Sequence, residues 1–192
     1  MPTAIATREE VLERLLLTFR RHGYESASLA LISEATGLGK ASLYHHFPGG
    51  KREMMLAVLD YIDLWFAREV LAPLTTSGDP ARRIKAMFDF LQRYYENGQE
   101  ACLLGVLSLE GTRDFYQDRL TQLFTDWIDA LANPLRALGS SRAQARLAAT
   151  HAIARIQGAL VVARGLGNTT AFTSELSALR AELLRATVPA IS

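Results

Sequence analysis

Residues 28–47 read SLALISEATGLGKASLYHHF and contain two short helical patterns separated by a glycine-rich turn. Ser28 is a suitable N-cap for the first pattern, and the second runs over residues 40–46. Gly37 suits the turn because glycine adopts positive φ without a steric penalty. Two short helices joined in this way match the helix-turn-helix arrangement, in which the second helix enters the major groove of DNA.

The rest of the chain also carries helical patterns, and alternating apolar runs typical of strands are nearly absent. Thr7 and Glu10 have the spacing of a capping box, and Pro73 is expected to end a long helix. The sequence therefore predicts an all-α protein with about nine helices. We expect them over residues 7–23, 28–36, 40–46, 51–71, 80–96, 100–110, 113–138, 141–166 and 171–188.

The composition is that of a globular protein, with 192 residues, 49% hydrophobic and 21% charged. Lys plus Arg is 21 and Asp plus Glu is 20, so a net charge of +1 excludes binding of nucleic acid through bulk charge alone. The single cysteine, the absence of a signal-peptide pattern and the lack of a long apolar stretch predict a cytoplasmic protein.

Basic residues are nevertheless concentrated locally. Residues 1–60 contain seven basic and seven acidic residues, but residues 14–24 hold three Arg and no acid, and residues 38–52 hold three basic residues and no acid. These two stretches predict one positive face on the N-terminal region.

The pattern GLGKASLYHHF at residues 37–47, followed by Lys51 and the apolar residues 54–59, resembles the DNA-binding domain of the TetR/AcrR family of transcriptional regulators. The close resemblance covers residues 7–60. The remaining chain is similar to the family as an all-helical region, and residues 101–110 resemble the LmrA/YxaF-like subgroup. The resemblance implies a three-helix helix-turn-helix domain at 1–50, joined to a helical-bundle domain at 51–192 for effector binding and dimerisation.

Within this motif, the hydroxyl of Ser28 at a helix N-terminus suits a DNA phosphate, and Lys40 suits a phosphate or a guanine edge. Gly39 stands where the family usually has a Ser or Thr cap. Leu43 is open to two interpretations, a base contact or a core residue, whereas Phe47 is expected in the core. The predicted DNA-binding residues are Ser28, Gly39, Lys40, Ala41, Ser42, Leu43, Tyr44, His45 and Lys51.

Apolar and aromatic residues recur at helical spacing after residue 80 and predict a core that also surrounds a ligand. Cys102 has two open interpretations, a buried small residue or a redox-sensitive thiol. The predicted ligand-binding residues are Phe88, Gln92, Tyr95, Cys102, Leu103, Leu107, Phe124, Trp127 and Gln157. Further polar candidates are Tyr94, Ser108, Glu110 and Arg155.

Helices near 141–166 and 171–188 are expected to pair with the same helices of a second chain in a four-helix interface. Their apolar stripes, the predicted interface, comprise Leu147, Ile153, Ile156, Leu160, Leu176, Leu179 and Leu183.

The sequence thus predicts a ligand-responsive regulator, with repression from a palindromic operator and release by a small apolar or aromatic effector. An activator with the same DNA-binding domain is an open alternative. An enzyme is disfavoured because no catalytic nucleophile–base set stands out. No cofactor is expected. A metal site is not expected either, because the adjacent His45 and His46 point about 100° apart on a helix. The expected partners are double-stranded operator DNA, the effector and a second copy of the chain, without a membrane.

Overall fold

The computed structural model describes residues 7–111 and 114–185, and these form two compact units. The N-terminal unit comprises residues up to Leu64 together with Leu103–Arg119, and the C-terminal unit comprises Trp65–Cys102 and the residues from Leu120 onward. Residues 103–119 therefore pack with the N-terminal unit, although they are separated from it in sequence. The division of the chain into functional domains at residue 50 remains a prediction.

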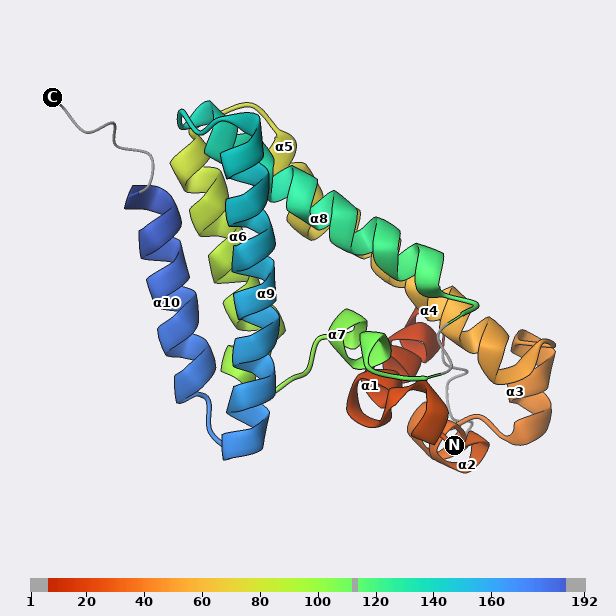
Figure 1. Ribbon diagram of the computed structural model, residues 1–192. Coiled ribbons are helices and arrows are strands. Elements are labelled where there is room, and N and C mark those ends of the chain that lie inside the picture. The colour runs from red at the N-terminus through yellow and green to blue at the C-terminus, as the bar shows by residue number, and fades with distance from the viewer. Residues whose placement is uncertain (1–6, 112–113, 186–192) are drawn as a thin grey trace, which may run out of the picture. The chain divides into compact units, whose positions relative to one another are not determined.

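The N-terminal unit contains α1 (Arg8–Ser26), α2 (Leu29–Thr36), α3 (Lys40–His46), most of α4 (Gly50–Phe66) and α7 (Leu103–Ser108). In Figure 1, α7 lies against α1 inside this unit. The sequence signals for the first helices are confirmed. Thr7 and Glu10 form a capping box on α1, and Ser28 caps α2. Gly37 ends α2 in the left-handed conformation with φ 71°.

The long helix predicted to end at Pro73 continues farther than expected. After Phe66, one π-helical turn, η1 (Ala67–Leu71), leads into α5 (Ala72–Thr75). Pro73 lies just after the π-helical turn, and the helical conformation continues past it to Thr75. If α4, η1 and α5 are counted as one helix, the described residues hold nine α-helices and no strand, so the all-α prediction is confirmed.

The C-terminal unit also contains α6 (Pro80–Tyr94), the 3₁₀ turn η2 (Glu96–Gly98), most of α8 (Gln117–Ala137), α9 (Arg142–Leu166) and α10 (Thr170–Arg185). Figure 1 shows α9 and α10 side by side with α6 next to them. The largest fully buried side chains of this unit include Phe88, Tyr95, Trp127 and Phe172. Arg155 on α9 pairs with Glu175 and Glu182 on α10 and thereby joins the two helices.

The structure corrects the predicted dimer stripe. Six of its seven residues are buried inside the single chain, so they form the core on which α9 and α10 pack. They cannot also face a second chain, and the prediction is wrong for them. The six are Ile153, Ile156, Leu160, Leu176, Leu179 and Leu183, and only Leu147 of the stripe is exposed.

Within the part of the chain that the structure describes, no helix is both long enough and apolar enough to cross a membrane.

Candidate nucleic-acid interface

The helix α3 exposes most of its side chains, starting at its first residue. Lys40, Ala41, Ser42, Tyr44 and His45 are all exposed. They lie on a helix of seven residues, about 10 Å long at 1.5 Å per residue, which fits the width of a major groove of about 12 Å. The exposed residue types include a cation, hydroxyls and a small apolar surface. They can therefore contact phosphates and base edges together.

Leu43 lies on the opposite side of α3 and is 0% exposed, and Phe47, just after α3, is buried as well. Of the two interpretations left open for Leu43, the structure supports the core residue. Together these two side chains attach α3 to the rest of the unit, so their contribution to the interface is to hold the exposed face in place.

The turn between α2 and α3 is fixed by a set of hydrogen bonds. The Thr36 hydroxyl donates to the Ile32 carbonyl at 2.7 Å and accepts from the Leu38 amide at 3.3 Å. Ser33 donates to the Leu38 carbonyl at 2.7 Å, and the Arg14 guanidinium donates to the Thr36 carbonyl at 2.8 Å. Because the polar groups of the turn have intramolecular partners, the orientation of α3 relative to α2 is preorganised.

The N-termini of α2 and α3 differ in their caps. The Ser28 side-chain oxygen accepts a hydrogen bond from the Leu31 amide at 3.2 Å, which leaves the hydroxyl hydrogen available to a phosphate. Gly39 caps α3 with extended φ and ψ of −65° and 160° and provides no side-chain hydrogen bond. A Cβ at position 39 would meet no heavy atom within 4 Å. The glycine is therefore not required by space or by backbone geometry.

Lys51, expected to contact phosphate, is half-buried at the start of α4. Its ammonium donates to the Glu25 carbonyl at 3.2 Å and lies 4.7 Å from the centre of the Tyr24 ring. One hydrogen bond to a carbonyl leaves two further donors on the ammonium. The phosphate contact of Lys51 stays a prediction, and the structure adds a second role, attachment to the end of α1.

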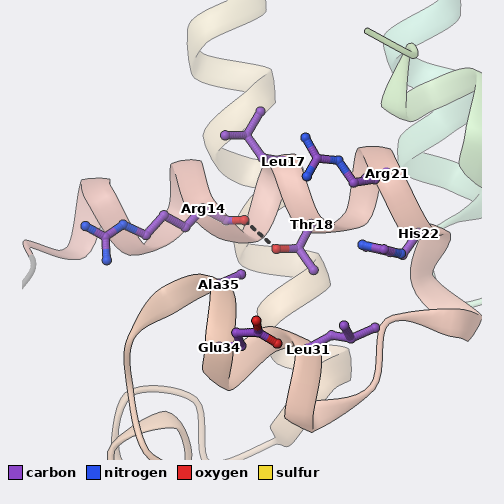
Figure 2. A pocket seen from close by; sticks show the side chains of 8 residues that line it. All are labelled: Arg14, Leu17, Thr18, Arg21, His22, Leu31, Glu34 and Ala35. Atoms are coloured by element: carbon purple, nitrogen blue, oxygen red, sulfur yellow. Dashed lines mark hydrogen bonds between the residues drawn. The ribbon is translucent and has the colours of Figure 1, made fainter.

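The basic residues of α1 do not share one surface. Arg14 and Arg21 line a groove of about 360 Å³ between α1 and α2, which Figure 2 shows with Glu34 on the facing helix. Arg20 is only 4% exposed and is therefore buried within the unit. The prediction of one positive face is therefore wrong for Arg20, because helical periodicity turns it about 100° away from Arg21.

The predicted ligand-binding residues fall into both units. Leu103 and Leu107 belong to the N-terminal unit, and the other seven belong to the C-terminal unit. Most of the nine are buried, Phe124 and Gln157 are half-buried, and Gln92 is exposed with its amide bonded to Asn97. The concave sites that we find on the C-terminal unit are lined by other residues.

Two of these residues carry buried polar atoms without a hydrogen-bond partner, Trp127 at Nε1 and Gln157 at Nε2. Three of the other polar candidates have partners inside the chain. Ser108 donates to the Leu104 carbonyl, Glu110 accepts from the Glu25 amide, and Arg155 pairs with α10. Cys102 is buried. Among residues 7–111 and 114–185, no group of three or more His, Cys, Asp or Glu side chains is arranged to hold a metal ion.

The contact of Glu110 with the end of α1, inside the N-terminal unit, is a feature that sequence reasoning missed. The sequence predicts that Gly23 ends the first helix; in the structure Gly23, with φ 74° and ψ 173°, interrupts the helical path, but α1 continues beyond it to Ser26. A glycine at a helix end does not reveal which distant side chain packs against it.

Comparisons with known proteins agree with this geometry. Residues 12–58 match the family of bacterial regulatory proteins called tetR, and residues 80–175 match the C-terminal domain of LmrA/YxaF-like transcriptional regulators. A regulator encoded in the lacX 3' region of Lactococcus lactis is 30% identical over 164 residues, which cover 81% of this chain and 82% of that protein. LmrA of Bacillus subtilis is 25% identical over 85% of this chain and 89% of its own length.

A solved structure of the TetR-family regulator CifR, a cysteine variant with 26-bp double-strand operator DNA, covers 97% of this chain and 98% of its own. It has a TM-score of 0.68 at 23% identity, which shows the same fold. The chain therefore belongs to the TetR family of bacterial transcriptional regulators, which are not enzymes, and its N-terminal unit carries the family's helix-turn-helix for binding DNA.

Proposed function

We propose that this regulator is a cytoplasmic repressor that binds a palindromic operator as a homodimer and is released by a small apolar or aromatic effector. The observation that supports the DNA contacts is the exposed face of α3, held by the buried Leu43 and Phe47 and by the bonded turn before it. Lys40 and Tyr44 provide its charged and aromatic donors. Ser28 adds a hydroxyl at the N-terminus of α2.

The dimer contact is proposed on the face of α9 that points away from the core. Leu147, Val161, Val162 and Leu166 are large apolar residues that are about half exposed or more. Between them, Ala154 and Gly158 are exposed and small, so a second helix can approach closely. A patch of this kind on a helix pair is typical of an interface between chains. The corresponding helices of a second copy, related by a two-fold axis, are the proposed occupant.

A two-fold dimer implies a two-fold operator. Its two α3 helices would contact half-sites about one helical turn of DNA apart, roughly 34 Å, or somewhat more, which predicts a palindrome. The 26-bp operator of the CifR complex is long enough for two such half-sites, since one turn is about 10.5 bp.

The effector class is proposed from the interior of the C-terminal unit. Its buried residues are mainly apolar and aromatic, and the N–H groups of Trp127 and Gln157 lack acceptors. A buried donor without an acceptor is unfavourable by about 1–3 kcal/mol. An apolar molecule that carries a carbonyl or a similar acceptor could satisfy one of them, and this supports a small apolar or aromatic effector.

DNA recognition is tested by selecting duplexes from a random double-stranded library with the wild-type protein and then measuring affinities by gel shift. Lys40→Ala and Tyr44→Ala should each lower the affinity for the selected duplex by about tenfold or more, because charge-assisted contacts contribute most of the affinity. Lys85→Ala is a matched control, since Lys85 is exposed on α6 in the other unit. Failure to enrich any sequence, or equal binding by all variants, contradicts the proposed recognition.

Transcription from a promoter that contains the selected site separates a repressor from an activator. A repressor lowers transcript yield when the protein is added, and an increase supports the activator instead. An effector is then identified as a compound that restores transcription, and its effect is limited by its preference for the DNA-free state.

A further inference from the structure

Residues 103–119 connect the two units in an unexpected way. The match to the LmrA/YxaF-like C-terminal domain begins at residue 80 and includes them, yet they pack with the N-terminal unit, where α7 lies against α1. Both ends of this segment continue into the C-terminal unit. The segment is therefore a part of the C-terminal domain that is built into the DNA-binding unit.

Glu110 makes a polar contact between this segment and α1. One carboxylate oxygen accepts a hydrogen bond from the Glu25 amide at 3.0 Å, and the other accepts from the Tyr116 hydroxyl at 3.1 Å. Gly23, with φ 74°, turns the chain out of the helical path just before Glu25. A Cβ at Gly23 would overlap Oε1 of Glu110, so the close approach of the carboxylate needs a glycine.

The peptide groups of Glu25 are held from two sides. Its amide donates to Glu110, and its carbonyl accepts from the ammonium of Lys51 at 3.2 Å. Aromatic contacts surround these bonds. The Tyr24 ring lies 5.1 Å from the Phe115 ring, centre to centre, and 4.7 Å from the Lys51 ammonium. The chain at Glu25 is therefore clamped between α4 and the segment 103–119.

The charge of Glu110 fits this arrangement. Burial raises the pKa of the Tyr116 hydroxyl, and the Glu110 carboxylate beside it raises it further. The hydroxyl accordingly stays protonated and continues to donate to Glu110. A carboxylate with two donors forms stronger hydrogen bonds than a neutral acceptor at the same place.

We propose that Glu110 is a positioning residue for DNA recognition, which fixes the α1–α2 connection and thereby sets Ser28 and Lys51 for contact with the operator. Ser28 follows Glu25 by three residues, so a displaced connection displaces the N-terminus of α2. This inference rests on the DNA contacts proposed above for Ser28 and Lys51.

The test uses the full-length protein and a duplex selected by the wild type. Glu110→Ala removes both hydrogen bonds, whereas Glu110→Gln keeps an oxygen acceptor for the Glu25 amide. Gly23→Ala places a methyl group where the carboxylate lies and leaves Glu110 itself unchanged. The controls are Asp114→Asn, which removes an exposed carboxylate from the same segment, and Gly167→Ala, which puts a side chain at a similar φ of 65° in open space.

If Glu110 is a positioning residue, Glu110→Ala and Gly23→Ala should lower the affinity for the selected duplex about tenfold or more. The affinity of Glu110→Gln should stay within about threefold of wild type. Binding to unselected DNA should be unchanged or slightly stronger, because loss of a carboxylate reduces repulsion from phosphates. Asp114→Asn should show only this charge effect, and Gly167→Ala should bind as the wild type does. In Glu110→Ala, affinity for the selected duplex would then fall while affinity for unselected DNA rises. A change of charge alone, or a smaller fraction of folded protein, would shift both affinities in the same direction.

Hydrogen exchange at the Glu25 amide provides a readout independent of DNA, and protection should fall in Glu110→Ala and Gly23→Ala. A folded Glu110→Ala protein that binds the selected duplex within twofold of wild type overturns the inference. If Glu110→Ala does not fold, wild-type affinity in Gly23→Ala overturns it equally. If the wild-type protein selects no DNA sequence, the proposed function is contradicted instead. In that case, unchanged hydrogen exchange at the Glu25 amide in the folded variants contradicts the role of Glu110.

Discussion

Replacement of Val161 by arginine should separate the proposed dimer while leaving each chain folded. Val161 lies on the exposed face of α9 with 63% of its surface exposed in the single chain. Full burial of a valine side chain contributes about 1.5–3 kcal/mol, so covering this exposed part contributes about 1–2 kcal/mol per chain. A two-fold interface contains the residue twice, which gives about 2–4 kcal/mol per dimer.

Arginine removes that contribution and also adds one positive charge from each chain to the proposed interface. Since 1.4 kcal/mol is a factor of ten, the dimer dissociation constant should rise by about 30-fold or more. Sedimentation equilibrium over a range of protein concentrations measures this change. Affinity for a two-half-site duplex should fall as well, because a monomer contacts only one half-site.

The matched control is Leu64→Arg, which makes the same change of charge at a leucine that is 77% exposed on α4. It should remain dimeric. Ile156→Ala gives the complementary result, since Ile156 is fully buried within one chain and its truncation should lower the stability of folding by about 2–5 kcal/mol. If Val161→Arg sediments as the wild type does and Leu64→Arg dissociates, the interface has been assigned to the wrong face.

Three further predictions concern the DNA-binding unit. Leu43→Ala should destabilise folding by about 2–5 kcal/mol because Leu43 is fully buried, and an unchanged Tm in thermal unfolding would return Leu43 to the list of surface contacts. Gly39→Ser should stabilise the protein by a few tenths of a kcal/mol through a new cap on α3, seen as a small rise in Tm, whereas a lower Tm would refute the open space at this position. Tyr116 should make the protein sensitive to alkali: its pKa is raised in the folded state, so its contribution is complete below about pH 10 and is lost as pH rises further, by up to about 1.4 kcal/mol per pH unit. Urea unfolding of Tyr116→Phe between pH 9 and about 11 should show a shallower loss, and an identical slope would argue against this origin.

Local sequence signals were sufficient for the first three helices. The Thr7–Glu10 capping box, the Ser28 cap and the left-handed Gly37 each act within four residues, and all three are present as predicted. Signals of this range report backbone hydrogen bonding, which depends little on the rest of the fold. The exposed and buried sides of α3 were only partly predictable, because a seven-residue helix is too short for its periodicity to separate Leu43 from its neighbours.

The two faces of α9 could not be assigned from the sequence. One face carries Ile153, Ile156 and Leu160, and the opposite one carries Val161 and Val162 among alanine and glycine. Both faces are apolar, and periodicity identifies a stripe without identifying its partner. Ile153, Ile156 and Leu160 are buried within the chain together with alanines of the same helix, while Leu147, Val161, Val162 and Leu166 remain exposed. Because large and small apolar residues occur on both faces, only the tertiary structure shows which face is buried within the chain.

The contact at Glu110 shows a second limit of local signals. Glu25 and Glu110 are 85 residues apart, and each taken alone is an ordinary polar residue near the end of a helix. Gly23 contributes in two ways, since its positive φ interrupts the helical path and its missing Cβ makes room for the carboxylate. Only the first role can be inferred from a glycine at a helix end. The second depends on a segment whose sequence matches the C-terminal domain, so a division of the chain by sequence similarity separates Gly23 from the residue that needs it. The DNA-binding unit is therefore completed by residues outside the stretch that encodes its helix-turn-helix.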